Sequence, residues 1–256
     1  MSATPPDDEF RLGRRIAVIQ NQTAQPTYQA TPLTLADFLD PAPGDEFVHG
    51  EQHRRDVARL AAALYARHRL SPFVHLLVGP KLKWAAPRGH PRLPQPAPDL
   101  VLVGEISDPD HPRTVLDLAA EPTVVRAVVE VTSPLFAELD LKDKPRIYAA
   151  AGIPEYWIVD AGLRPAQPQL RYAIMGYRLD GDAYRPIAPD RERGNLTSPA
   201  MRVCFRVTPD GQDYLIADAR TGRPIIAAAE DAPNFTARVE ATFRAADIAA
   251  KLDLRP

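Results

Sequence analysis

The segment VVRAVVEVTSP, residues 124–134, is the feature that most limits the fold of this 256-residue chain. The run is almost continuously apolar, which is typical of a central β-strand covered on both faces. One carboxylate, Glu130, lies inside it. Because an ionised carboxylate in apolar surroundings must be paired or bound to a cation, the strand predicts either a buried ion pair or a metal ligand at this position.

Several further elements are predicted around this strand. Residues 53–68 carry apolar side chains three and four apart, which predicts a helix that covers a sheet. Residues 73–87 and 99–105 are rich in β-branched and large apolar side chains and predict two or three strands. Residues 142–152 predict a helix that ends at a glycine, and residues 155–160 predict another buried strand. This order is typical of an α/β fold.

The domain organisation follows from where these patterns begin and end. Residues 1–33 are polar and rich in proline, which predicts a flexible N-terminal leader. Residues 34–230 are interpreted as one domain, with a core at 45–162 and a β-rich extension at 163–230, and residues 231–256 as a C-terminal helix. We therefore expect an α/β domain with a mixed central sheet flanked by helices and a β-rich C-terminal portion.

Two short segments precede the first long helix. Residues 35–40 predict a short helix capped by Thr34, and residues 45–50 predict a brief strand.

Composition excludes several classes of protein. The formal charge of −2 provides no overall basic surface, which counts against tight nonspecific binding of DNA. No apolar run reaches membrane-spanning length and no signal peptide is visible, so we expect a cytoplasmic protein without a membrane partner. The single cysteine, Cys204, excludes an internal disulfide and a thiolate-rich metal site, and we expect it in the core.

Three residues are candidates for chemistry. Asp99 follows a proline and opens a strand, so it is either a turn residue or a carboxylate at the edge of a cleft. Glu130 is the buried carboxylate already described. Lys144 falls on the apolar face of its helix with Tyr148, which turns it toward the sheet, although its spacing from Asp140 also allows a solvent-exposed ion pair.

Three segments together resemble a known family. APDLVLV, AVVEVTSP and DLKDKPRIYAAAGIPEYWIVD are similar to the Uma-two family of restriction endonucleases, a branch of the PD-(D/E)XK nuclease superfamily, and the resemblance covers roughly residues 34–230. It implies a restriction endonuclease-like fold. It also implies that Asp99 and Glu130 bind Mg²⁺ or Mn²⁺, with the main-chain carbonyl of Val131 as a further ligand, and that Lys144 assists the attacking water. The usual E-x-K lysine would stand at Thr132, so the resemblance implies that the helix supplies it.

The segment before the first long helix holds weaker candidates. Glu46 and Glu51 match acidic positions of the family, and one of them could approach the metal. His49 and His53 have a spacing that suits a metal on a helix, but Gly50 between them favours a solvated helix start.

Two aromatic residues follow the predicted site. Tyr156 and Trp157 lie in a buried-strand pattern, so we expect them in the core rather than stacked on nucleic-acid bases.

The predicted function is metal-dependent hydrolysis of phosphodiester bonds, with DNA as the expected partner and a homodimer as the expected assembly. One alternative is a catalytically degenerate nuclease fold that binds nucleic acid or a partner protein, which Thr132 and the lack of net positive charge favour. Another is a glycosidase that uses Asp99 and Glu130 as its acid and base, but this leaves Lys144 without a role.

Overall fold

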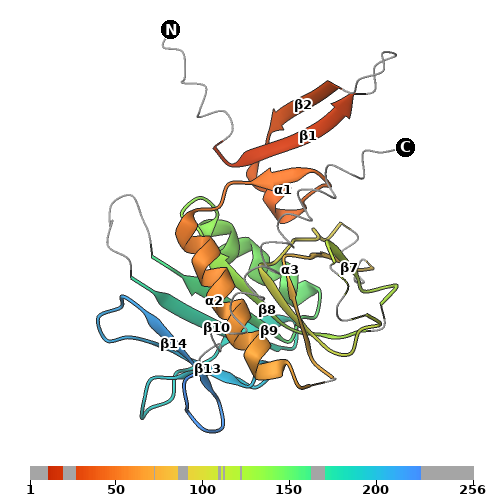
Figure 1. Cartoon of the computed structure of the whole chain (residues 1–256). Helices are drawn as coiled ribbons and strands as arrows, with labels where there is room; N and C mark the ends of the chain where they lie inside the picture. The colour runs from red at the N-terminus through yellow and green to blue at the C-terminus, as the bar shows by residue number, and fades with distance from the viewer. Residues whose placement is uncertain are drawn as a thin grey trace.

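A six-stranded mixed sheet forms the centre of the computed structural model, which describes residues 11–19, 27–71, 73–85, 92–108, 111, 113–121, 123–162 and 171–225 (Figure 1). The strand order is β11-β10-β9-β8-β6-β4. The strands are β4 (His75–Val78), β6 (Leu100–Val103), β8 (Val125–Thr132), β9 (Glu155–Asp160), β10 (Ala173–Asp180) and β11 (Ala183–Pro186). Strands β8 and β9 are parallel and the other pairs antiparallel, which confirms the predicted mixed sheet.

Helices cover both faces of this sheet. The long helix α2 (Glu51–His68) packs its apolar side chains against Val129 and Val131 of β8. The short helix α3 (Lys144–Ala150), which continues the single π-helical turn η1 (Leu139–Asp143), packs on the side of Val128. Because side chains alternate along a strand, Glu130 shares the face of Val128 and is directed toward α3.

The N-terminal residues differ from the predicted leader. Strands β1 (Gly13–Ile19) and β2 (Thr27–Pro32) form a small sheet with β3 (Asp45–Phe47), in the order β2-β1-β3. The guanidinium of Arg15 binds Asp45 at 2.6 Å and Asp37 at 2.7 Å, so charge pairs and backbone pairing stabilise this sheet. The expectation of a loose leader is therefore wrong for these strands, which lack the apolar alternation that marks most strands.

Helix α1 (Leu35–Leu39) follows β2 and begins as predicted. Thr34 is its N-cap and forms a capping box with Asp37, in which each side chain accepts a hydrogen bond from the other residue's backbone.

The β-rich extension contains a separate three-stranded sheet of β12 (Leu196–Ser198), β13 (Val203–Val207) and β14 (Tyr214–Asp218). It joins α2 through Asp56, a buried carboxylate that accepts hydrogen bonds from Tyr172 and Tyr214. Strands β5 (Lys81–Lys83) and β7 (Val115–Asp117) form a two-stranded parallel pair. The predicted C-terminal helix, residues 231–256, lies outside the described residues.

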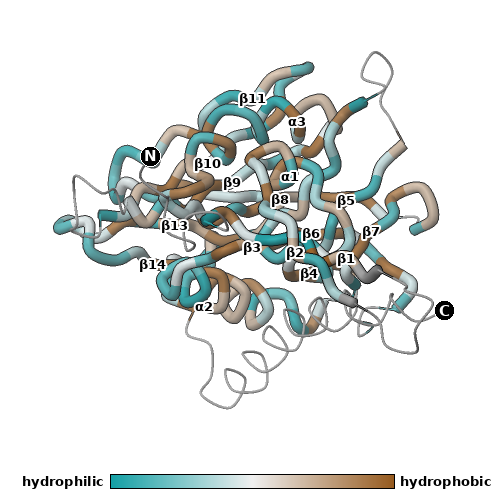
Figure 2. Tube along the Cα trace, turned by 90° about the horizontal axis from the view of Figure 1, so that it is seen from above, coloured by the Kyte–Doolittle hydropathy of each residue, from teal (hydrophilic) through white to brown (hydrophobic). Residues whose placement is uncertain are grey.

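The core lies between the sheet and the helices. In Figure 2 the hydrophobic stretches gather along β9 and β10, in the middle of the view, and the coil of α2 changes between hydrophobic and hydrophilic turns. Tyr156 and Trp157 are fully buried and Cys204 is buried, as predicted. Within the part of the chain that the structure describes, none of the helices has the length and apolar character that crossing a membrane requires.

Gly176 in β10 allows close packing at Trp157, and this gives a testable result. A Cβ atom at Gly176 would lie 2.6 Å from two ring atoms of Trp157, which is fully buried and cannot move aside without disturbing the core. We expect Gly176→Ala to lower the free energy of unfolding by about 1–3 kcal/mol, the usual effect of overpacking. Urea unfolding measures it, with Gly104→Ala as control because its nearest contact is an ordinary 3.6 Å. Equal stability of the two variants would contradict the packing described.

Candidate active site

The three predicted residues come from three different elements. Asp99 immediately precedes β6, Glu130 lies near the end of β8, and Lys144 is the first residue of α3. The structure places Lys144 Nζ 2.9 Å from Glu130 Oε1, and both side chains are almost completely buried. The prediction that Lys144 faces the sheet is therefore confirmed.

Lys144 is held by a second carboxylate. Its Nζ lies 2.9 Å from Asp140 Oδ1, and Asp140 is buried in η1. The alternative of a solvent-exposed pair is wrong, because the pair forms in the interior. Burial alone would lower the pKa of Lys144, but Asp140 and Glu130 together raise it well above its usual range. The site thus contains a permanent buried cation.

Glu130 carries a strongly perturbed carboxyl group. Burial raises its pKa to about 8, and the nearby charge of Lys144 offsets this only in part. Its Oε1 also accepts a hydrogen bond of 2.7 Å from the hydroxyl of Tyr148. Both contacts use Oε1, so neither of them occupies Oε2.

Asp99 is ionised and held by two donors. The backbone N–H of Val131 donates to its Oδ2 at 2.7 Å, and Nε2 of His53 lies 3.1 Å from Oδ1 and 3.2 Å from Oδ2. Burial opposes ionisation, but the charge and hydrogen bond of His53, together with the N–H of Val131, lower the pKa of Asp99 to about 2. With 14% of its side chain exposed, Asp99 is the most accessible member of the predicted triad.

An aromatic layer covers the lysine. The ring centroid of Phe38, from α1, lies 4.2 Å from Lys144 Nζ, within the range of a cation–π contact. Phe38 stacks on Phe136 at 3.9 Å and meets Phe47 edge-on at 5.2 Å. The N-terminal segment therefore contributes directly to the site, which the sequence patterns did not indicate.

His53 corrects the prediction of a solvated helix start. Helix α2 begins at Glu51 with Gly50 as N-cap, as the glycine suggested, but His53 is only 5% exposed because the third residue of the helix is turned toward Asp99. The ring of His49 stacks on that of His53 with centroids 4.2 Å apart. Burial lowers the pKa of His49 to about 4, so it is neutral near pH 7.

The two glutamates proposed near the metal are engaged elsewhere. Glu46 pairs with Arg14 at 2.8 Å, and Glu51 pairs with Arg55 on the exposed side of α2. None of their described contacts joins them to the buried cluster, so that prediction is wrong. Tyr148 is the functional candidate that sequence reasoning missed. The sequence patterns indicate Asp140 as an exposed ion-pair partner and His53 as a solvated residue, but both are buried members of the cluster.

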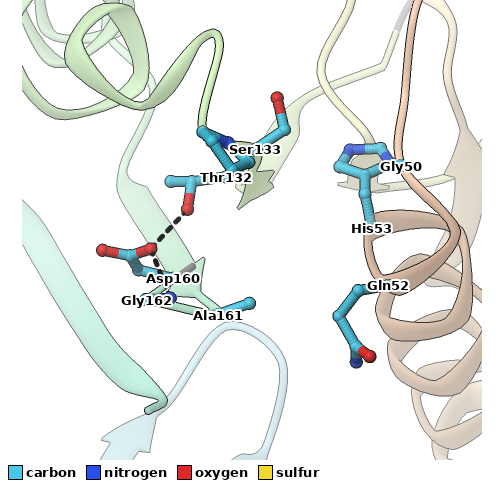
Figure 3. Close-up of a pocket in the computed structure, with 9 residues that line it drawn as sticks. Gly50, Gln52, His53, Thr132, Ser133, Asp160, Ala161 and Gly162 are labelled. Atoms are coloured by element: carbon cyan, nitrogen blue, oxygen red, sulfur yellow. Dashed lines mark hydrogen bonds between the residues drawn. The ribbon is translucent and has the colours of Figure 1, made fainter. Parts of the chain in front are cut away.

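A small pocket of about 40 Å³ lies beside the cluster, at the ends of β8 and β9 (Figure 3). Thr132 and Ser133 line one side, and His53 lies across from them. The hydroxyl of Thr132, which stands at the usual E-x-K lysine position, donates to Asp160 at 2.7 Å. This hydrogen bond links the ends of the parallel strands β8 and β9.

The donor set of the cluster suits a hard divalent cation. Three carboxyl groups, of Asp99, Glu130 and Asp140, have Lys144 and His53 as their nearby cationic partners among the described residues. In the described residues, no three side chains of His, Cys, Asp or Glu converge as a metal-binding group. A centre here would use two carboxylates plus main-chain and water oxygens, which fits Mg²⁺ because that ion keeps several waters.

Comparison with known proteins assigns the chain to a family. The profile of the Uma2 family, described as "Putative restriction endonuclease", matches residues 42–207. The chain belongs to the Uma2 family. The match includes all three predicted site residues, and the family assigns the chain to the endonucleases. No curated protein matches the sequence.

A solved structure from the comparison is similar to this Uma2 chain. It is a putative nuclease of the DUF820 group from Anabaena variabilis, 11% identical, with a TM-score of 0.44. The similarity covers 80% of this chain and 99% of that one.

Proposed function

We propose that this Uma2 protein is a metal-dependent endonuclease that hydrolyses phosphodiester bonds of DNA. In this proposal Asp99 and Glu130 hold Mg²⁺ or Mn²⁺, and Lys144 supplies a fixed positive charge beside them. The observation that carries it is the buried contact of Lys144 with Glu130, next to an ionised Asp99. Burying a lysine and several carboxyl groups costs desolvation free energy, and such clusters occur most often at functional sites. A lysine in this place would stabilise the negative charge of a bound phosphate.

The backbone of β8 supports a role for the carbonyl of Val131. Leu100 of β6 pairs with Val129 of the antiparallel strand β8. If this register is continued two residues before Leu100, Pro98 lies opposite Val131. Proline has no N–H to donate to the carbonyl at that point of the ladder. In a strand the N–H and C=O of one residue point to the same side, and the Val131 N–H already binds Asp99. The carbonyl is therefore directed toward Asp99 and is suited to a third protein ligand.

The remaining residues have distinct tasks in this proposal. A bound divalent cation would polarise the scissile phosphate and make a bound water more acidic. Lys144 stabilises the negative charge that develops during in-line attack, and its raised pKa keeps it charged. Tyr148 and Asp140 hold Glu130 and Lys144 in place.

The proposal includes a homodimer acting on DNA. Cleavage of a duplex requires hydrolysis of one bond in each strand, and two copies of one site meet this need by symmetry. The net charge of −2 favours binding through local contacts at the site over a general attraction to DNA.

A specific observation favours the alternative of a catalytically degenerate binding module. Lys144 is completely buried and covered by Phe38, so the described arrangement gives a phosphate no direct path to its Nζ. If the protein is an endonuclease, α1 must move so that Phe38 uncovers Lys144 and the substrate can enter. If it is a binding module, α1 would stay in place.

A plasmid-cleavage assay distinguishes the two functions. We expect the unaltered protein to nick or linearise plasmid with Mg²⁺ or Mn²⁺ and to stop when EDTA is added. Asp99→Asn should reduce the rate by at least about 100-fold, because a metal ligand contributes several kcal/mol to the transition state. Asp117→Asn is the matched control, since that carboxylate pairs with Lys83 on the surface. Cleavage that survives EDTA, or equal rates for the two variants, would refute the mechanism.

A further inference from the structure

His53 makes a contact at the site that its sequence position does not predict. Its Nε2 lies almost equally far from the two oxygens of Asp99, at 3.1 Å and 3.2 Å. A nitrogen placed between two carboxylate oxygens at these distances is a hydrogen-bond donor, so Nε2 carries a hydrogen. Since only 4% of the His53 side chain is exposed, water does not compete for this contact.

Asp99 depends on such donors for its orientation. It precedes β6, whose first residue is Leu100, so its side chain extends beyond the regular pairing of that strand. Its carboxylate is fixed from two directions, by the N–H of Val131 in β8 and by His53 in α2. The two donors come from separate rigid elements, and without His53 the carboxylate could rotate about the single contact to Val131.

The other side of the imidazole faces the pocket of Figure 3. His53 Nδ1 and Ser133 Oγ are both buried, and neither has a hydrogen-bond partner among the described residues. Both residues line the pocket of about 40 Å³, which is large enough for one water molecule. A water held there would give Nδ1 a hydrogen-bond partner on the side of the ring away from Asp99.

We propose that His53 is a positioning residue of the metal site, which acts by fixing the orientation in which the carboxylate of Asp99 would hold the cation. The inference rests on the proposed metal-dependent function and adds a residue to it. His53 acts through Asp99, as outer partners of metal-binding carboxylates do.

Calorimetric titration with Mn²⁺ tests the proposal on the full chain. His53→Leu removes the donor, and we expect it to weaken Mn²⁺ binding about 10–100-fold, the usual effect of losing an outer partner. His53→Gln keeps a donor near Nε2 and should restore most of the affinity. His49→Leu is the matched control, because His49 stacks on His53 without a described hydrogen bond to Asp99. If His53→Leu does not fold, His53→Asn, whose amide is too short to reach Asp99, takes its place.

The outcomes separate this inference from the proposed function. If His53→Leu binds Mn²⁺ like the unaltered protein, or His53→Gln is as weak as His53→Leu, the positioning role is overturned while the endonuclease stands. Nitrogen coupling from His53 in the pulsed EPR spectrum of bound Mn²⁺ would also overturn it, because His53 would then be a direct ligand. If the unaltered protein binds neither Mn²⁺ nor Mg²⁺, the proposed function fails and this inference with it.

Discussion

Lys144→Met is expected to lower the free energy of unfolding by about 3–5 kcal/mol, since it removes the partner of two buried carboxyl groups. Nζ of Lys144 lies 2.9 Å from both Glu130 and Asp140, and each of these side chains is at most 3% exposed. Methionine fills a similar volume, so the loss reflects two buried carboxyl groups left without their partner rather than a cavity. The same variant should reduce plasmid cleavage by about 100- to 1,000-fold, as expected when a transition-state charge partner is lost.

A double variant separates the structural role of Lys144 from its catalytic role. Asp140→Asn combined with Lys144→Met removes one negative charge together with the positive one. We expect urea unfolding to show that most of the lost stability returns, whereas cleavage stays as low as in Lys144→Met alone. If activity returned with stability, Lys144 would be only a structural counter-ion, and the binding-module alternative would gain support.

The strands and helices around Glu130 could be predicted because their signals are local. A continuous apolar run marks β8, and the 3.6-residue period marks α2 and turns Lys144 toward the sheet. A single carboxylate in such a run already implied a partner, and Lys144 is that partner. Local periodicity therefore located two members of the triad and the direction in which each side chain points.

The rest of the site depends on contacts between residues far apart in the chain. Phe38 reaches Lys144 only because β1 pairs with β3, and the strands of this sheet carry arginine–carboxylate pairs instead of an apolar stripe. The sequence predicted a solvated His53 because its neighbours in the first helical turn are polar. Its burial is set by Asp99, 46 residues away, and helix periodicity contains no information about that neighbour.

The perturbed carboxyl groups give the metal-free protein an unusual dependence on pH. Folding raises the pKa of Glu130 from 4.5 to about 8, so between these values the folded chain holds a proton that the unfolded chain has lost. Stability therefore falls as pH rises through this window, by a total on the order of 5 kcal/mol. Asp140 and His53 also have raised pKa values and act in the same direction.

The pKa of Asp99 is shifted in the opposite direction, so its effect on stability depends on pH in the opposite sense. Folding lowers its pKa from 3.8 to about 2, so it stabilises the protein above pH 3.8, and this contribution is lost as pH falls toward 2. The combined contribution of these two carboxyl groups to the stability of the metal-free protein is therefore greatest near pH 4–5.

A divalent cation should reverse this trend at high pH. The cation and the proton compete for the carboxylate of Glu130, whose Oε2 is not used by the contacts to Tyr148 and Lys144. We expect a saturating Mg²⁺ concentration, about 100 times its dissociation constant, to stabilise the protein by about 2.7 kcal/mol at pH 8.5. At pH 6 the same concentration should have little effect, because Glu130 is protonated there.

Thermal and urea unfolding from pH 5 to pH 9, with and without Mg²⁺, measures both effects. Glu130→Gln is the decisive comparison, because its carboxamide keeps an oxygen for Tyr148 and Lys144 but does not titrate. We expect this variant to lose most of the decline in stability between pH 5 and pH 8 and most of the stabilisation by Mg²⁺. A flat profile in the unaltered protein would show that Glu130 is ionised throughout. Mg²⁺ stabilisation of equal size in Glu130→Gln would exclude Glu130 as a ligand.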